Sequence, residues 1–199
     1  MAQAFRSTPH GMIARLDPQE RGLLRRLFED VVTMLEPEDA GQTGDDGAVD
    51  PLEQMLGFTE DVEAPRDPAL HRLLPDASSN AERSQEFRRY TERSLREEKV
   101  GALRRAAMAV EHDPVQLEGT AVQDFSRALN DVRLVLATRL EIESEEDARR
   151  VEAAASQTAV GKIEDAQTYM AVVYGFVSWL QNSLVEAMLL DLPGDHLRP

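Results

Sequence analysis

Hydrophobic residues in most of this chain recur at intervals of three and four, the spacing that places side chains on one face of an α-helix. The clearest runs occupy residues 18–36, 120–141 and 164–191. The first run opens with Asp17 and Glu20, which can form a capping box around the free backbone amides of a first turn. The pattern therefore predicts a helix over residues 18–36.

The other two runs are apolar on more than one face. The stripe in residues 120–141 consists of Val122, Phe125, Leu129, Val132, Leu136 and Leu140, with Leu134 and Val135 on another face. Residues 164–191 include a charge-free stretch from Tyr169 to Val185. A helix that is apolar on several faces is usually buried on several faces. We predict an all-α fold, a helical bundle built around these two buried helices.

Shorter patterns predict the remaining elements of a single helical domain over residues 1–199. The segment from Phe5 to Arg15, interrupted by a proline and a glycine, predicts a small N-terminal β-hairpin. Further helices are predicted over residues 51–56, 68–74, 80–112 and 144–157, with a break in the long one near residues 90–94. Thr120 and Gln123 predict a second capping box.

The charge-free stretch must also be compared with a membrane span. It is 17 residues long, includes Gln181, Asn182 and Ser183, and falls short of the roughly 20 predominantly apolar residues that cross a bilayer. The residues from Met1 to Leu16 also lack the unbroken apolar core of a secretory signal. We therefore expect a buried helix, no membrane association and a cytoplasmic location.

The net charge of −15 at first argues against any nucleic-acid partner, because phosphates repel an acidic surface. Its distribution weakens that argument. Ten acidic residues and no basic residue lie in residues 36–63, so this segment holds two-thirds of the net charge. Its centre, residues 37–50, contains three glycines and little that could be buried, which predicts a mobile acidic loop.

The sequence offers few groups for catalysis. There is no cysteine, which excludes disulfides, thiolate nucleophiles and cysteine-ligated zinc. Neither a Glu-x-x-His nor a His-x-x-x-His pair occurs, so the helical patterns of di-iron and zinc sites are missing. No glycine-rich phosphate loop precedes a helix. We expect a protein that is not an enzyme and that needs no metal or cofactor.

One basic stretch could bind a phosphate or an acidic partner. Arg89, Arg93 and Arg96 are spaced so that three guanidinium groups share one face of a helix. The alternative is a solvated face in which Arg93 pairs with Glu97 and Arg96 pairs with Glu92, each pair contributing little. The spacing alone favours the solvated face and leaves nucleic-acid or partner binding open.

Two further groups lie on the predicted buried helices. Asn130, Asp131 and Arg133 border the apolar stripe, where a charge needs a partner, so we predict a buried polar network. Phe176, Trp179 and Leu180 form an apolar group on the last helix. This second group is interpreted as core or as a homodimer contact.

Three segments of the chain form a recognisable combination. They are Asp67-Pro-Ala-Leu-His-Arg-Leu-Leu-Pro-Asp76, the run from Ala128 to Leu134 continuing to Arg139-Leu-Glu-Ile142, and the closing helix around Tyr174, Trp179-Leu180 and Leu184. In this order, and over nearly the whole chain, they resemble actinobacterial domain-of-unknown-function family 2017. Members are small helical proteins often encoded beside the adaptor of the Clp protease. Some are described as oxidative-stress transcription regulators of the AosR type.

The resemblance implies a regulator of gene expression that acts on RNA polymerase or a sigma factor. Oxidation sensing through a cysteine pair cannot operate in a chain without cysteine. No helix-turn-helix signature is present, so protein–protein contact is the favoured mode, with a homodimer as a further expectation. Two alternatives stay open: a regulator that binds DNA directly through its arginine face, and an adaptor linked to Clp proteolysis.

Overall fold

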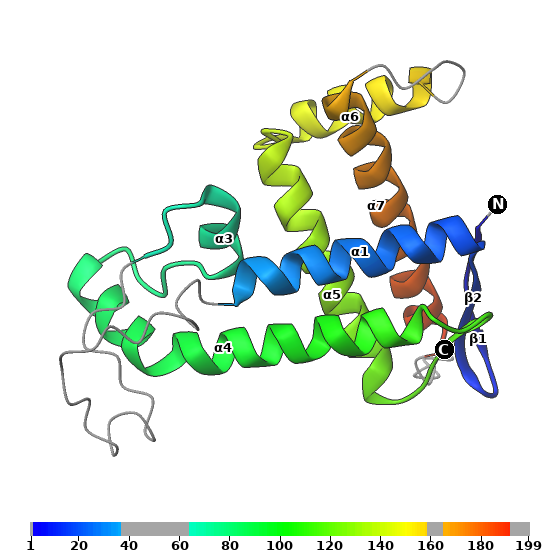
Figure 1. Ribbon diagram of the computed structural model, residues 1–199, viewed down its shortest axis with the longest axis horizontal. Coiled ribbons are helices and arrows are strands. Elements are labelled where there is room, and N and C mark those ends of the chain that lie inside the picture. Colours follow the sequence, from blue (N-terminus) through cyan, green and yellow to red (C-terminus); the bar gives the residue numbers. More distant parts are fainter. Residues whose placement is uncertain (1, 37–63, 159–164, 192–199) are drawn as a thin grey trace, which may run out of the picture.

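The computed structural model describes residues 2–36, 64–158 and 165–191 (Figure 1). The predicted mobile loop at residues 37–50 and the predicted helix at residues 51–56 lie outside the described residues. The helices are α1 (Pro18–Leu35), α3 (Pro68–Leu73), α4 (Ala81–Ala109), α5 (Thr120–Arg139), α6 (Glu145–Thr158) and α7 (Ala166–Asp191). The strands are β1 (Gln3–Thr8), β2 (Gly11–Arg15) and β3 (Val115–Leu117).

The predicted fold class is confirmed: the described chain is mainly helical, with a small hairpin at its N-terminal end. The prediction is wrong about two elements. Strand β3 was not expected, and it adds to the hairpin in the order β1-β2-β3 with antiparallel pairing throughout. The predicted break near residues 90–94 is absent, because α4 is one continuous helix.

Side-chain caps explain where two helices begin. The Asp17 carboxylate accepts hydrogen bonds from the backbone amides of Gln19 and Glu20 at 2.9 and 3.0 Å, and Glu20 returns one to the Asp17 amide at 2.8 Å. Asp67 caps α3 in the same manner, through the amide of Ala69. The second predicted capping box is wrong, because Thr120 is already helical and the cap position of α5 is Gly119, which has no side chain.

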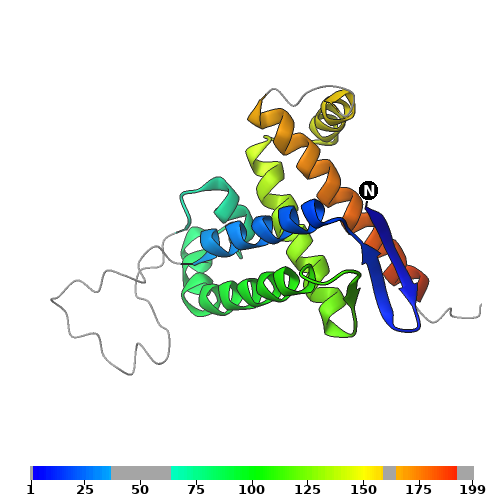
Figure 2. The same ribbon diagram turned by 45° about the vertical axis from the view of Figure 1, so that its right-hand side comes forward.

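The turn between β1 and β2 requires glycine. Gly11 has a φ of +92°, and a Cβ atom built there would lie 2.2 Å from the carbonyl oxygen of Leu117. This close approach lets β2 pair with β3, with Met12 opposite Leu117 and Ala14 opposite Val115. The sheet thereby ties the N-terminal segment to the connection between α4 and α5 (Figure 2).

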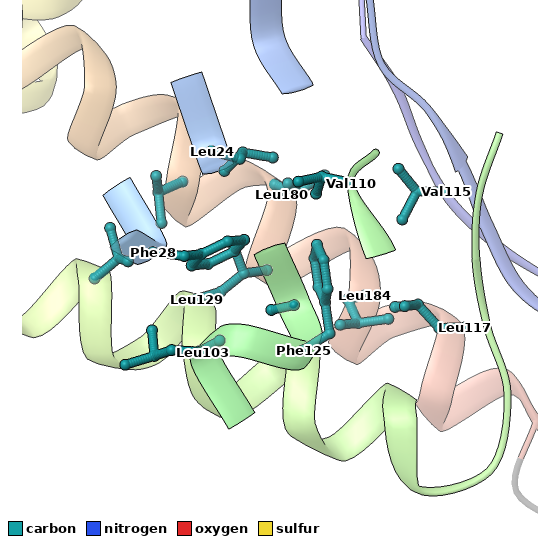
Figure 3. Close-up of a cluster of buried hydrophobic side chains, with 14 of the residues drawn as sticks. Leu24, Phe28, Leu103, Val110, Val115, Leu117, Phe125, Leu129, Leu180 and Leu184 are labelled. Atoms are coloured by element: carbon teal, nitrogen blue, oxygen red, sulfur yellow. The ribbon is translucent and has the colours of Figure 1, made fainter. Parts of the chain in front are cut away.

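The core lies where two helical layers cross. Helices α1 and α4 run side by side in one layer, and α5 and α7 run antiparallel in the layer behind them (Figures 1 and 2). Phe125 of α5 lies between the layers and makes edge-on ring contacts with Phe5 and Phe28, at centroid distances of 5.6 and 5.7 Å. Leu129 and Leu180 pack beside it (Figure 3), so the predicted central helices do contain the core.

Strand β1 lies against α7, at the other end of the chain. The Phe5 backbone amide donates to the Ser183 hydroxyl at 3.2 Å, and the Ser7 hydroxyl donates to Asp191 at 2.9 Å. None of the helices in the described ranges, α7 included, is long and apolar enough to span a bilayer.

Candidate interaction surface and buried polar clusters

Helix α7 presents an apolar face to solvent as well as to the core. Tyr169, Val172, Phe176 and Trp179 follow one another at steps of three, four and three, and these four residues are called the α7 apolar face. Tyr169 is 45% exposed and Trp179 is 40% exposed, whereas Val172 and Phe176 are half-buried. The rings of Phe176 and Trp179 stack, with centroids 6.2 Å apart.

The structure separates the predicted apolar group of α7 into two parts. Leu180 is fully buried in the core beside Val177 and Leu184, so it is not available for a contact between molecules. Phe176 and Trp179 belong to the α7 apolar face. A stacked aromatic pair that is partly open to solvent is the type of group that anchors protein–protein interfaces.

The charged residues of α7 are acidic. The helix contains no lysine or arginine, and its charges are Glu186 and Asp191. Asp165 lies just before its first turn and accepts a hydrogen bond from the Thr168 backbone amide at 2.7 Å. The α7 apolar face is therefore accompanied along its own helix by negative charge alone.

The three arginines of the predicted basic face have different surroundings. Arg89 is exposed, and Arg93 pairs with Glu97 at 3.0 Å on the surface. Arg96 is mostly buried: it binds Glu92 through two nitrogens at 2.9 and 2.7 Å and donates to the Leu35 carbonyl at 2.8 Å. Both ion pairs of the solvated alternative are present, although the one at Glu92 is buried. Phosphate binding by this face stays a prediction, and it would require Arg96 to give up these bonds.

A cluster that the sequence analysis did not single out lies next to Arg96. Arg88 is 6% exposed and donates to Glu92 at 2.7 Å, to Asp76 at 2.9 Å and to the Leu74 carbonyl at 3.3 Å. We call Asp76, Arg88, Glu92 and Arg96 the Arg88 cluster. Through it, α4 is attached to the segment that follows α3 and to the end of α1.

The carboxylate of Asp76 is held in its ionised form. Hydrogen bonds from the Ser84 hydroxyl, from Arg88 and from His71 lower the pKa of Asp76 below its usual value. The spacing of Arg88, Glu92 and Arg96, four residues apart along one helix face, is the signal that could have indicated this cluster.

The predicted polar network on α5 is arranged differently from the expectation. Arg133 donates to Asn130 at 3.3 Å, and both side chains are half-buried. Asp131, only 3% exposed, instead accepts a 2.7 Å hydrogen bond from Lys99 of α4. Burial raises the pKa of Asp131 above its usual value, against the opposing effect of Lys99. The three residues therefore form two separate contacts.

Comparison with known proteins identifies the family of the chain. The model of the family described as Domain of unknown function (DUF2017) matches residues 2–188. The chain belongs to this family. The match covers β1, α5, α7 as far as Met188, and the Arg88 cluster, so these are parts of the family's domain. No curated protein and no solved structure matches the chain.

Proposed function

We propose that this protein is a non-enzymatic regulator that acts by binding another protein through the α7 apolar face. The observation that supports the proposal is the stacked pair of Phe176 and Trp179, whose ring centroids are 6.2 Å apart. The pair is partly open to solvent, on a helix whose buried residues help to fill the core. Because the rest of α7 is fixed by the core, the two rings are held in position before any partner arrives.

The charge of the chain specifies the kind of partner. Outside residues 36–63 the chain holds 27 acidic and 22 basic residues, a net charge of −5, and the two charges of α7, Glu186 and Asp191, are both acidic. A protein with an apolar groove and a basic rim would complement both features. A second copy of this chain would have to bring acidic residues together, so we propose a different protein as the principal partner and a homodimer as the competing arrangement.

The family resemblance indicates the cellular process for this proposal. We propose an actinobacterial cytoplasmic regulator of transcription or of the stress response, similar to AosR-type proteins, with the transcription machinery as the partner. Because the chain contains no cysteine, its signal does not act by forming a disulfide. A role as an adaptor for Clp proteolysis stays a weaker proposal, since only the gene neighbourhood of the family supports it.

Direct DNA binding through Arg89, Arg93 and Arg96 is the alternative. It is less well supported, because Arg93 and Arg96 are already bound to glutamates. Binding to promoter DNA that falls steeply with salt and is lost when all three arginines are replaced by alanine would favour this alternative. Lack of binding at low salt would exclude it.

The experiment is a comparison of partners recovered by the wild-type chain, by a Phe176→Ser/Trp179→Ser double variant and by a Met108→Ser control. Met108 is 65% exposed and lies on α4, so it tests a hydrophobic substitution on a different helix. We expect a basic partner that binds the wild type and the control equally and the double variant at least tenfold more weakly. Titration of the purified pair should show weaker binding at high salt.

Equal binding of a purified partner to all three chains would contradict the proposal, since the α7 apolar face would then not be the contact. Light scattering tests the competing arrangement. A dimer that the double variant converts to a monomer would assign the face to a second copy of the chain and would overturn the proposal of a different partner.

A further inference from the structure

Four residues of α7 surround one position on its surface where a side chain from another helix can pack. They occupy positions i, i+3, i+4 and i+7 of the helix and are Val172, Gly175, Phe176 and Trp179. This is the arrangement that receives a single side chain when two helices pack against each other. Trp179 is 40% exposed, and the other three residues are half-buried. We call these four residues the Gly175 site.

The glycine leaves one side of the Gly175 site without a side chain. A Cβ atom built at Gly175 meets no described residue within 4 Å, beyond its chain neighbours and the nearby backbone of α7. Glycine is a poor residue for the interior of a helix, and no group of the core requires it here. A side chain brought by another molecule therefore has room at this position.

Gly22 of α1 shows that an open glycine alone does not make such a site. A Cβ atom at Gly22 also meets no described residue within 4 Å. The residues three and four positions after it are Arg25 and Arg26, which are exposed and charged. The residues after Gly175 include the stacked, uncharged ring of Trp179, so the surroundings of Gly175 favour an apolar side chain.

The surface of α7 continues the Gly175 site into a line on which a second helix can lie. Val172, Gly175, Trp179, Asn182 and Glu186 follow one another at steps of three and four residues. These alternating steps are those of helices packed side by side. All five residues are half-buried or exposed, so the core does not occupy the line.

The line ends in a negative charge. Glu186 is exposed and forms no ion pair within the described part of the chain. It lies three helical turns after Gly175, which is about 16 Å along the helix. Helix α7 contains no lysine or arginine. A partner residue that lies beside Glu186 is therefore expected to be basic.

A second copy of α7 does not complement this line. In a parallel pair, Glu186 would meet its own counterpart. In an antiparallel pair centred on Gly175, Glu186 would come beside Asp165, which is also acidic and exposed. In both arrangements glycine would face glycine, and no side chain would fill the Gly175 site.

We propose that the partner places an α-helix along α7, with one large aliphatic side chain in the Gly175 site. A lysine or arginine of the same helix, about three turns away, pairs with Glu186. The inference rests on the proposed function, since it specifies which element of the partner contacts the α7 apolar face. The helix forms one wall of the partner's apolar groove.

The probe for this proposal is a synthetic helical peptide of about 20 alanine-rich residues, with leucines on one face and an arginine three turns from the central leucine. A fluorescent label makes the anisotropy of the peptide a measure of binding. The emission of Trp179, the only tryptophan of the chain, reports whether the peptide covers the site. One control peptide has a proline at its centre, which breaks the helix. Another has glutamate in place of the arginine.

The variant that tests the site is Gly175→Gln, which fills it without meeting the core, and Gly22→Gln is its matched control. Both should raise the melting temperature, because glutamine forms helices more readily than glycine. We expect the helical peptide to bind the wild type and Gly22→Gln equally, with Trp179 emission at shorter wavelengths, and to bind Gly175→Gln at least tenfold more weakly. Glu186→Gln should remove the preference for the arginine peptide over the glutamate peptide.

Three results would overturn the inference: no binding of the helical peptide to the wild type, equally tight binding of the proline peptide, or equal binding to the wild type and Gly175→Gln. The proposed function is decided separately, because Phe176→Ser/Trp179→Ser tests the α7 apolar face without any assumption about the shape of the partner. A partner that binds this double variant weakly and Gly175→Gln normally would retain the face and reject the helix at the Gly175 site.

Discussion

Arg88 and Asp131 are both almost completely buried and both take part in ion pairs, yet their surroundings differ. In the Arg88 cluster, two carboxylates and a backbone carbonyl accept from one guanidinium group. Asp131 of α5 has the single ammonium group of Lys99, and the buried Gln181 oxygen of α7 has no donor among the described residues. A fully bonded charge fastens elements together, whereas a buried acceptor without a donor costs stability.

The largest effect is expected from Arg88→Met. The substitution leaves the Leu74 carbonyl without its donor and Glu92 without one of its two arginine partners, in a buried place. It should lower the free energy of unfolding by about 3–5 kcal/mol. Urea-induced unfolding measures this value. Arg89→Met, on the exposed neighbour, should change it by less than about 0.5 kcal/mol. Equal effects of the two substitutions would show that the Arg88 cluster does not fasten α4.

A second comparison separates two arginines of the same helix. Arg96→Ala removes the hydrogen bonds to Glu92 and to the Leu35 carbonyl, so we expect a loss of about 1.5–3 kcal/mol. Arg93→Ala removes one surface pair with Glu97 and should cost less than about 0.5 kcal/mol. Thermal unfolding of both variants checks this order. An equal cost would mean that Arg96 is as solvated as Arg93.

A substitution of Gln181 should have the opposite effect on stability. Gln181→Met removes a buried acceptor that lacks a partner, so we expect the free energy of unfolding to rise by about 1 kcal/mol. Gln167→Met, at the exposed start of α7, serves as the control, and urea-induced unfolding is the measurement. A clear loss of stability in Gln181→Met would show that the glutamine makes a bond essential to the fold.

The smallest effect is expected in how the free energy of unfolding depends on pH. The pKa of Asp76 is lowered by folding, so the ionised Asp76 carboxylate stabilises the folded chain above the ordinary pKa of 3.8. This stabilisation is lost as pH falls toward the lowered pKa. The pKa of Asp131 is raised, so its ionisation costs stability as pH rises from 3.8 through the raised value. We would measure the free energy of unfolding of Asp76→Asn and of Asp131→Asn as a function of pH. Relative to the wild type, the two substitutions should change the slope of this dependence in opposite directions. A change in the same direction would contradict the difference between the two carboxylates.

The sequence predicted those features that depend on local spacing. The capping box of Asp17 and Glu20 located the start of α1, and the apolar stripes located α5 and α7 as the centre of the core. Strand β3 could not be predicted in the same way, because three residues are too few for an alternating pattern and their pairing with β2 defines them. The start of α5 at Gly119 likewise involves no side-chain cap to detect.

The site residues were predictable to a smaller extent for the same reason. That Asp131 requires a partner follows from its place on a buried helix, but its partner Lys99 lies on another helix, 32 residues away in sequence. Arg96 resembled a surface residue because its bond to the Leu35 carbonyl spans 61 residues. Exposure of Trp179 beside buried Leu180 also depends on the packing of neighbouring helices, which periodicity alone does not specify.

The contact of β1 with α7 has a consequence for biosynthesis. The hydrogen bond from Phe5 to Ser183 joins residues 178 positions apart, and Phe5 is 4% exposed once it is made. During translation the strand therefore leaves the ribosome long before the helix that covers it, and its aromatic side chain has no α7 to pack against until nearly the whole domain has been synthesised. In this interval a nascent chain exposes the Phe5 ring, to which chaperones can bind.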